Sequence, residues 1–504
     1  MDTIKKKELF RALKFVLFSI SAGVIQILSY TLLYEVAGLV EWASYLISLT
    51  LSVVWNFTFN RKFTFKSASN VPVAMLKVAL FYAVFTPLST LLEYYLTDVL
   101  GWVGYIATAI NMVINFVTEF FYQRYFVFGN SIDTNSSLSD RDKELLERAK
   151  TTLFNNVYED NGYPWSPYRC ITPGKNHFKG IWNWDNAFHA IGASRYDTEI
   201  AKDNILGFFK FQREDGLLPD LIYENGEIID LYQKPPVFAY ATEVVYKRCK
   251  DKEFLKEIYP KLVKNQEYWD KNRLYNGMYY YDSEGRDRKD HLQLVKYESG
   301  WDNSARWDNG IIEYWAIDLN CFMVLSFRSL KNIARKLGFN SDAKRWKDRE
   351  KELSNLIIDK CFDKENGYFA DVNRFTGEIS KELSPASFMP LFVGIATVEQ
   401  AQKMQDIAVE KFKCKMPTVP FDSEKYSNDY WRGPTWLNVA YFASKGLKDY
   451  GFKVGDEIKE WVLDTCYREK GGIYENYDSI TGKGLCCDHF SWSSVFIIEF
   501  ILNW

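Results

Sequence analysis

Residues 298–304 read Glu-Ser-Gly-Trp-Asp-Asn-Ser, and a second stretch, Tyr-Glu-Asn-Tyr-Asp, follows at 474–478. Each stretch places one carboxylate among aromatic residues, since Asp302 follows a tryptophan and Glu475 lies between two tyrosines. Aromatic rings offer flat apolar surfaces for packing. A carboxylic acid paired with a carboxylate can protonate a leaving oxygen and activate a water molecule. The two stretches therefore predict the hydrolysis of a glycosidic bond.

The composition limits the kind of protein. The chain has 504 residues, more than one hydrophobic core usually organises, so two or more domains are predicted. Lysine and arginine number 62 and aspartate and glutamate 65, a balance that does not indicate a nucleic acid partner. The eight cysteines lack paired metal-type spacing, and adjacent Cys486 and Cys487 suit neither a metal knuckle nor an easy disulfide. We expect a reducing compartment, no metal and no cofactor.

The amino-terminal quarter of the chain is apolar. Residues 15–38 are almost uncharged and long enough to cross a bilayer, and they are too long for the core of a signal peptide. Further apolar stretches cover 43–59, 74–96 and 102–121. The sequence therefore predicts a transmembrane domain of four helical spans over residues 1–128.

Basic residues predict the orientation of these spans. They gather before the first span and between the second and third, namely at Lys5, Lys6, Lys7, Arg11, Lys14, Arg61, Lys62 and Lys66. The other two connections carry acids and no lysine or arginine. By the positive-inside rule, both termini and the large carboxy-terminal domain are expected in the cytoplasm.

Two segments of this domain resemble each other. They are Asn56-Phe-Thr-Phe-Asn-Arg-Lys-Phe-Thr-Phe and Asn115-Phe-Val-Thr-Glu-Phe-Phe-Tyr-Gln-Arg-Tyr-Phe-Val-Phe. This pairing resembles the GtrA-like family, whose members are associated with moving polyprenyl-phosphate-linked sugars across membranes. In that family an asparagine usually precedes the second arginine, whereas here it is Gln123. Arg61 and Arg124 would suit a lipid phosphate, or they are ordinary positive-inside anchors.

A polar stretch at 129–140 is expected to be a linker, and a domain at 141–504 follows it. Apolar residues recur at helical spacing in 311–337 and 341–361, and no βαβ alternation or glycine-rich phosphate loop is present. The predicted fold class is all-α. Helical hairpins that carry function in their connecting loops suggest an α/α barrel.

Six motifs follow one another in this domain. They are Trp182-Asn-Trp-Asp-Asn-Ala-Phe, Gln212-Arg-Glu-Asp-Gly-Leu-Leu-Pro, Ser299-Gly-Trp-Asp-Asn-Ser, Tyr430-Trp-Arg-Gly-Pro-Thr-Trp, Glu475-Asn-Tyr and Phe490-Ser-Trp-Ser. The series resembles glycoside hydrolase family 63 and the related trehalases, and it extends over nearly the whole domain. The resemblance implies an (α/α)6 barrel and an inverting mechanism on α-linked sugars.

The resemblance also implies roles for the two carboxylates. Asp302 would be the general acid and Glu475 the general base, with their carboxyl groups roughly 6.5–9.5 Å apart. We expect an apolar setting to keep Asp302 protonated and Glu475 to be ionised. Alternatively, Asp302 caps a helix. Asp308 could compete for the acid role, although its loop position suits a structural contact better.

Several aromatic and polar residues are predicted to bind substrate. Trp184 and Asp185 match the family's sugar-binding pair, with Asp185 accepting bonds from hydroxyl groups; otherwise they are a core tryptophan and a capping aspartate. The predicted pocket also takes in Trp301, Trp431, Arg432 and Trp436. Arg432 could instead form a structural ion pair, and Trp492 is expected to pack beneath the site.

One position departs from the family. Relatives usually place glutamine before the Pro-Pro that faces the substrate, whereas here Lys234 precedes it. A cation in the pocket would favour an anionic aglycone, the group released from the sugar. Lys234 could equally point to solvent.

The leading hypothesis is a membrane-tethered, cytoplasm-facing inverting α-glycosidase of the α-glucosidase or α-mannosidase type. Its substrate would be an α-linked sugar with an anionic or lipid aglycone. The alternative is a protein that translocates polyprenyl-linked sugars and whose barrel binds carbohydrate without hydrolysing it. A phosphorolytic relative is disfavoured, because phosphate would attack directly and Glu475 would be dispensable.

Overall fold

The computed structural model describes residues 3–39, 41–64, 71–102, 104–127, 138–159 and 161–504. The chain divides into two compact units, Met1–Leu138 and Ser139–Trp504. Of the predicted linker at 129–140, the part before residue 138 lies outside the described residues.

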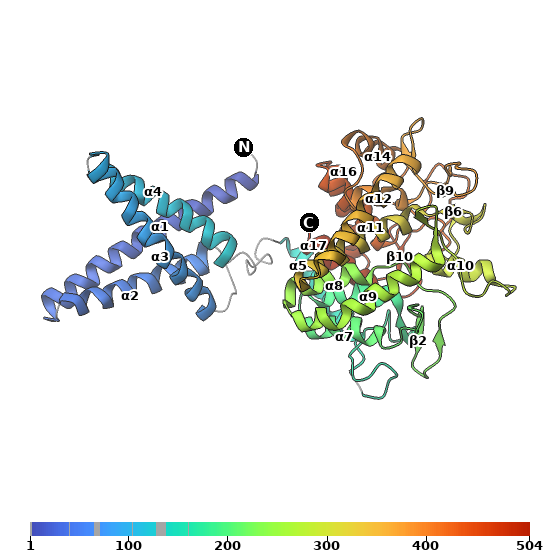
Figure 1. The fold of residues 1–504 in the computed structure, drawn as a ribbon, viewed down its shortest axis with the longest axis horizontal. Helices are drawn as coiled ribbons and strands as arrows, with labels where there is room; N and C mark the ends of the chain where they lie inside the picture. The colour runs from blue at the N-terminus through green and yellow to red at the C-terminus, as the bar shows by residue number, and fades with distance from the viewer. Residues whose placement is uncertain (1–2, 40, 65–70, 103, 128–137, 160) are drawn as a thin grey trace. The chain divides into compact units, whose positions relative to one another are not determined.

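The smaller unit is built from long helices that pack in pairs (Figure 1). Its described helices are α1 (Thr3–Thr31), α2 (Glu41–Phe59), α3 (Val71–Tyr94) and α4 (Gly104–Tyr122). Each continues as a π-helical turn, namely η1 (Leu32–Val36), η2 (Asn60–Thr64), η3 (Tyr95–Val99) and η4 (Gln123–Val127). Helix α1 packs against α2, and α3 packs against α4.

The surface of this unit is apolar. Most of the exposed large apolar side chains of the described chain lie here, with Ile27 68% and Leu91 64% exposed. Among the described residues, one helical stretch, Lys14–Val36, is both long and apolar enough to cross a membrane, and Met75–Ser89 is a shorter apolar helix. The structure thus gives one candidate span, and the count of four stays a prediction.

The two similar segments carry corresponding polar pairs. In the first, the Asn60 amide nitrogen donates to Asn56 Oδ1 over 2.7 Å; in the second, the Gln123 amide nitrogen donates to Glu119 Oε1 over 2.8 Å. Each pair ends one residue before an arginine, Arg61 in η2 or Arg124 in η4. The side chains of both arginines lie outside the described part of the structure.

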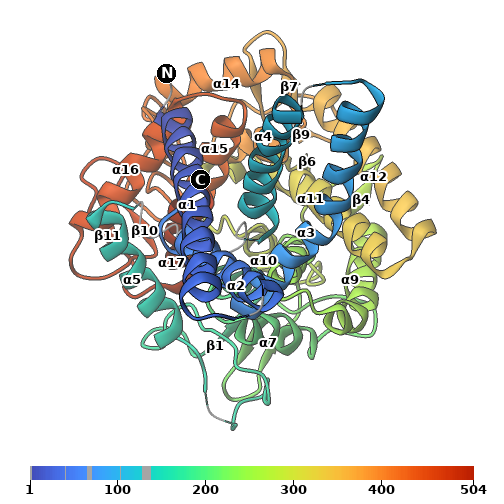
Figure 2. The same ribbon diagram turned by 90° about the vertical axis from the view of Figure 1, so that its left-hand side faces the viewer.

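In the larger unit, helices alternate along the chain between an inner and an outer position. The inner helices are α6 (Asn183–Ala193), α8 (Phe238–Cys249), α11 (Ile317–Leu337), α13 (Met389–Phe392), α15 (Leu437–Asp449) and α17 (Ser491–Leu502). The outer helices are α5 (Asp140–Asn155), α7 (Thr198–Phe209), α9 (Lys252–Arg273), α12 (Asn340–Lys360), α14 (Val398–Glu410) and α16 (Val454–Arg468). Each inner helix contacts the next and α17 contacts α6, which closes a helical barrel whose outer helices lie around its periphery (Figure 2).

Hydrophobic patterning explains which helices lie inside. Every residue of α6 is buried, and so are Ser491 to Ile501 of α17. A largely apolar helix such as α17 belongs in a core, whereas α6 also buries the polar side chains of Asn183, Asp185, Asn186 and His189. By contrast, α12 buries only a stripe at helical spacing, made of Ala343, Trp346, Leu353 and Ile357. The mostly helical prediction is confirmed.

Short antiparallel strands connect the helices. The three-stranded sheet consists of β1 (Gly180–Trp182), β2 (Leu221–Tyr223) and β3 (Ile228–Ile229). The two-stranded pairs are β4 (Leu274–Tyr275) with β5 (Met278–Tyr279), β6 (Tyr314–Trp315) with β9 (Val372–Asn373), β7 (Phe362–Asp363) with β8 (Tyr368–Phe369), and β10 (Asn476–Tyr477) with β11 (Gly484–Leu485). The all-α prediction missed these strands, because two or three residues are too few to show an alternating pattern.

A buried ion cluster fastens the loop that carries residues 301–307. The guanidinium of Arg306 donates to both carboxylate oxygens of Asp318 over 2.9 Å, and to those of Asp371 over 2.8 and 3.1 Å. It also lies 4.8 Å from the ring centre of Trp301 and 4.3 Å from that of Trp307. The loop is therefore tied to the start of α11 and to the segment before β9.

Candidate active site

Loops of the larger unit enclose an inner cavity of about 250 Å³. Its wall is mostly aromatic and acidic. The lining residues are Pro173, Phe178, Trp182, Trp184, Asp185, Asp220, Leu221, Tyr223, Tyr232, Lys234, Tyr297, Gly300, Asp302, Tyr430, Trp431, Trp436, Glu475, Phe490 and Trp492. The motifs at 182–188, 299–304, 430–436, 475–477 and 490–493 thus meet around one space.

Tryptophan side chains form a continuous cluster along this wall. Trp431 and Trp436 stack with ring centres 3.8 Å apart, and Trp492 lies 5.7 Å from Trp436 and 5.1 Å from Trp184. Trp301 packs against Trp431 at 4.7 Å but does not line the cavity. Trp492 does line it, contrary to the expectation that it packs beneath the site.

A glycine contact joins two of the motifs. Gly300 ends α10 (His291–Ser299) with a φ of 73°, in the left-handed region that favours glycine. A Cβ atom at this position would lie 2.3 Å from Cζ2 of Trp184. Glycine is therefore required between Ser299 and Trp301, and it sets the start of the Asp302 turn directly against the cavity wall.

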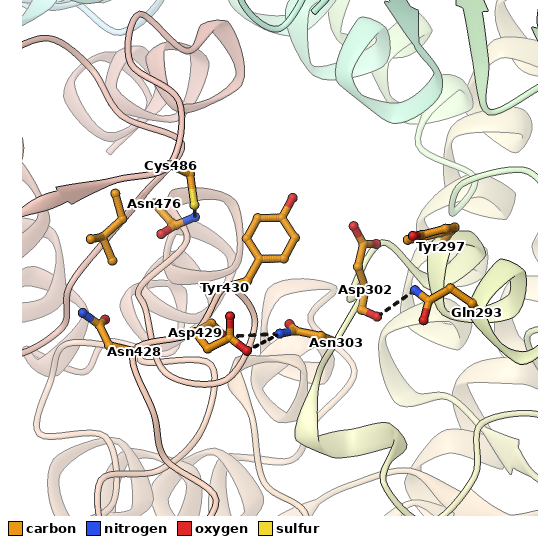
Figure 3. A pocket seen from close by; sticks show the side chains of 10 residues that line it. Gln293, Tyr297, Asp302, Asn303, Asn428, Asp429, Tyr430, Asn476 and Cys486 are labelled. Atoms are coloured by element: carbon orange, nitrogen blue, oxygen red, sulfur yellow. Dashed lines mark hydrogen bonds between the residues drawn. The ribbon is translucent and has the colours of Figure 1, made fainter. Parts of the chain in front are cut away.

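Asp302 lines an outer cavity of about 640 Å³ (Figure 3). It also lines the inner cavity, so it lies where the two cavities meet. The amide nitrogen of Gln293 donates to the backbone oxygen of Asp302 over 3.3 Å. The Oδ1 atom of Asp302 is buried and has no hydrogen-bond partner among the described residues. Figure 3 shows its carboxyl group projecting to the same side as the Tyr430 hydroxyl. The carboxyl group is thus available to a ligand.

Glu475 lines the inner cavity and not the outer one. It directly precedes β10, and its backbone N–H donates to the carbonyl of Cys487 over 2.8 Å. Its backbone oxygen accepts a bond from Ser493 Oγ over 3.1 Å. The Tyr430 hydroxyl donates to its Oε1 atom over 3.0 Å. The Cys487 loop and α17 therefore fix the backbone of Glu475, and Tyr430 fixes its side chain.

Burial controls the protonation of both acids. It raises the pKa of Asp302 to about 6, against the opposing attraction of Lys234. It raises the pKa of Glu475 to about 7, although the Tyr430 hydrogen bond lowers it. We expected Asp302 to hold its proton more tightly than Glu475. Instead Glu475 has the higher pKa, because a glutamate carboxyl starts from a higher ordinary pKa than an aspartate carboxyl and because Lys234 lowers the pKa of Asp302.

Lys234 lies in the inner cavity wall and not in solvent. Its Nζ atom lies 3.5 Å from Asp220 Oδ1, and it donates to the backbone oxygen of Tyr297. Burial raises the pKa of Asp185 to about 8, again against the attraction of Lys234. A pKa raised to this extent favours a protonated Asp185, which could donate a hydrogen bond to a sugar as well as accept one from a hydroxyl group.

Two predicted substrate-binding residues lie outside both cavities. Trp301 is 2% exposed and packs behind Trp431. Arg432 donates to the two carboxylate oxygens of Asp308 over 2.8 and 2.9 Å, so the alternative of a structural ion pair describes it better. The hydrogen bond from Arg432 lowers the pKa of Asp308. Asp308 is therefore held as a carboxylate in an ion pair, which is a structural role and not that of a general acid.

Other lining residues had not been singled out from the sequence. Asp220 directly follows the motif that ends at Pro219, and Tyr430 opens the motif in which its two tryptophans were noted. Tyr232 and Tyr297 stand in no motif that marks them. Beyond the two cavities, ligand atoms of His177, Cys487 and Asp488 lie within 4.8 Å of one another.

Family models match both parts of the chain. Residues 179–493 match the mannosylglycerate hydrolase MGH1-like glycoside hydrolase domain, and residues 14–128 match the GtrA/DPMS transmembrane domain. Both resemblances drawn from the motifs are confirmed.

Curated relatives match at low identity. The chain is 23% identical to mannosylglycerate hydrolase MGH1 of Selaginella moellendorffii, over 71% of this chain and 86% of that protein. It is 22% identical to the mannosylglycerate hydrolase of Rubrobacter radiotolerans, over 66% and 92% of the two chains.

Solved structures share the fold. The GH63 mannosylglycerate hydrolase from Thermus thermophilus, in complex with glucose, matches with a TM-score of 0.61 and 23% identity over 70% of this chain and 99% of that one. The neutral trehalase Nth1 of Saccharomyces cerevisiae matches with a TM-score of 0.56 and 19% identity, over 70% and 79% of the chains.

Proposed function

Because the chain belongs to the mannosylglycerate hydrolase MGH1-like glycoside hydrolase family, we propose that it cleaves an α-linked mannoside or glucoside with inversion at the anomeric carbon. Asp302 is the proposed general acid and Glu475 the general base. The observation that carries this proposal is that both line one aromatic cavity, while Asp302 alone also borders the outer cavity. The sugar occupies the inner cavity, and the departing group leaves through the outer one.

This placement fits the steps of inversion. The glycosidic oxygen lies between the sugar and the aglycone, so its proton donor must stand where the two cavities meet, as Asp302 does. The base activates water on the opposite face of the sugar. Glu475 suits this step, because Tyr430 and the Cys487 backbone hold it within the inner cavity. Trp184, Asp185, Trp431 and Trp436 surround the sugar in this scheme.

The pair works with one shared proton. With a pKa of about 6 for Asp302 and about 7 for Glu475, the two buried acids hold one proton between them near neutral pH. Sugar hydroxyl groups that donate to Glu475 move this proton off it, because hydrogen bonds to a carboxylate favour its ionised form. The proton then resides on Asp302, where cleavage needs it.

The outer cavity favours a neutral, hydroxyl-rich aglycone. The amide nitrogens of its lining residues already donate within the protein: Gln293 to Asp302 O, Asn303 to Asp429 Oδ2, Asn428 to Asp478 Oδ2, and Asn476 to Cys486 Sγ. Each of these amide groups keeps a second N–H, and the acceptors that remain include the buried Oδ1 atom of Asn476, which has no partner among the described residues, and the carboxylate of Asp429. Hydroxyl groups donate to such atoms, whereas a carboxylate cannot.

The charge of the outer cavity also favours a neutral aglycone. No lysine, arginine or histidine is among the described residues that line the outer cavity. The neighbouring guanidinium of Arg432 is bound by Asp308, and Lys234 faces the inner cavity with Asp220. We therefore replace the expected anionic or lipid aglycone by a second sugar or another polyol.

The amino-terminal unit is proposed to be the membrane anchor. The match to the GtrA/DPMS transmembrane domain and the apolar surface of α1 to α4 support four spans. The basic residues in the amino-terminal half of α1 and after α2 favour cytoplasmic termini. Residues 1–128, 129–140 and 141–504 are then anchor, linker and hydrolase. Arg61 and Arg124 follow corresponding polar pairs and would bind the phosphate of a polyprenyl-linked sugar.

Removing either carboxylate should abolish turnover without unfolding the barrel. In full-length protein in detergent, Asp302→Asn and Glu475→Gln should each lower kcat on an α-glycoside by at least about a hundredfold, as expected for general acid and base groups. Asp308→Asn is the matched control, because Asp308 pairs with Arg432 outside both cavities. Turnover by Asp302→Asn at the wild-type rate would refute its role.

The shared proton predicts a narrow pH profile. Below about pH 6 both acids are protonated and Glu475 cannot activate water, and above about pH 7 both are ionised and Asp302 cannot donate. The kcat/KM profile should therefore be a bell with its maximum between these values. Lys234→Gln should move the alkaline limb to higher pH, because Lys234 lowers the pKa of Asp302.

Lys425→Gln is the control for this shift, since Lys425 pairs with Asp308 and Glu382 outside both cavities. Both limbs of the pH profile of Lys425→Gln should stay at the wild-type pH values. A profile that rises or falls over the whole range without a maximum would be incompatible with the shared proton.

The aglycone proposal is tested by comparing a neutral and an anionic substrate. An α-linked mannobiose should give a kcat/KM at least about tenfold above that of mannosylglycerate, because like charges about 4 Å apart repel by about 1–4 kcal/mol. Asp429→Asn should narrow this ratio, whereas Asp422→Asn, which pairs with Lys411 away from both cavities, should not. Preference for mannosylglycerate by the wild type would overturn the proposed aglycone.

A further inference from the structure

A second cluster of reactive side chains lies beside the inner cavity. A ring nitrogen of His177, Sγ of Cys487 and a carboxylate oxygen of Asp488 lie within 4.8 Å of one another. His177 Nε2 is 3.3 Å from Asp488 Oδ1, and Nδ1 of His489 is 3.3 Å from the same oxygen. The chain has four histidines, and two of them meet here.

We propose that His177, Cys487 and Asp488 bind one divalent transition-metal ion of the zinc class, with His489 or a water as the fourth ligand. The ligand set combines a thiol, an imidazole and a carboxylate, which are the three side-chain types that zinc binds. Sulfur and nitrogen donors select against calcium and magnesium, which take oxygen ligands. A tetrahedral zinc site places ligand atoms about 3.4–3.6 Å apart, so the separations require only small side-chain rotations.

One asparagine, Asn156, links the loop that carries His177 to the loop that carries Cys487 and Asp488. The amide nitrogen of Asn156 donates to the His489 carbonyl over 2.8 Å, and its Oδ1 accepts from the Lys175 N–H over 3.1 Å. Further backbone bonds tie the second loop, from Phe490 N–H to Ile473 O and from Ser491 N–H to Pro173 O, both over 2.8 Å. The ligand backbones are thus fixed without metal, and binding requires little ordering of the chain.

Backbone strain marks the second loop. Cys486 and His489, which flank Cys487 and Asp488, have φ angles of 61° and 51°. Non-glycine residues adopt this left-handed region at a cost of about 1–3 kcal/mol, and such strain clusters at functional sites. The Cα atom of Gly174 lies close to the thiol, since a Cβ atom at this position would be 3.3 Å from Cys487 Sγ.

A metal at this point would act on the catalytic loop. The carbonyl of Cys487 accepts the backbone N–H of Glu475, and Phe178 and Phe490, each next to a ligand residue, line the inner cavity. Binding would clamp the two loops that carry this part of the wall and fix Glu475 more firmly. The expectation of no metal rested on cysteine spacing, whereas these ligands come from positions 311 residues apart.

Cobalt(II) titration of the reduced full-length protein in detergent tests the site. We expect one Co²⁺ ion per chain, with a thiolate-to-cobalt absorption band that ZnCl₂ displaces. Cys487→Ser should abolish this band. His177→Ala, which changes a half-exposed side chain, should weaken Co²⁺ binding by at least about tenfold without affecting the circular dichroism.

Cys486→Ser and His291→Ala are the matched controls and should keep the band. Cys486 is the neighbouring thiol, and His291 pairs with Asp282 elsewhere in the barrel. The proposal is overturned if no saturable band forms, if the band survives Cys487→Ser, or if His177→Ala binds Co²⁺ as tightly as the wild type. None of these readouts depends on the proposed glycosidase mechanism.

Discussion

The site depends on the attraction between the ammonium group of Lys234 and the acids packed around it. Asp185, Asp220, Asp302 and Glu475 line one small cavity, and Lys234 is the one basic side chain among its described lining residues. Aromatic walls exclude water, so that burial raises the pKa of each acid. Lys234 opposes this effect at Asp185, Asp220 and Asp302, so without the cation these three acids would be driven further towards their protonated forms.

The barrel supplies the rigidity that this arrangement needs. Inner helices buried all round leave little freedom to the loops that join them. Arg306 anchors the loop of Asp302 to the start of α11, and Gly300 lets the same loop approach Trp184 closely. Glu475 is fixed separately, by Tyr430 and the Cys487 backbone. Acid and base thus come from segments far apart in sequence, yet each is held by packed contacts.

The sequence predicted the helical framework, because apolar residues recur at helical spacing. It also predicted most of the cavity wall, because the aromatic and acidic residues of the wall stand in short, recognisable motifs. The sequence did not predict which residues lie behind the cavity wall and not in it. Trp301 and Arg432 were therefore assigned to the wall, although they pack behind it. The order of the two pKa values also escaped prediction, since the burial of both acids and the attraction of Lys234 for Asp302 exist only in the folded chain. The outer cavity was not predicted, because its lining residues come from separate loops. The hydrogen bonds that orient two of them, Gln293 and Asn428, form only in the folded chain.

The central claim is that one acid and one base act on opposite faces of the sugar in a single displacement. Proton NMR of the first sugar released by the full-length protein, recorded before mutarotation, tests this most directly. Inversion predicts that the β-anomer appears first from an α-glycoside. Initial release of the α-anomer would mean a double displacement, and it would contradict the assignment of Asp302 and Glu475 as acid and base.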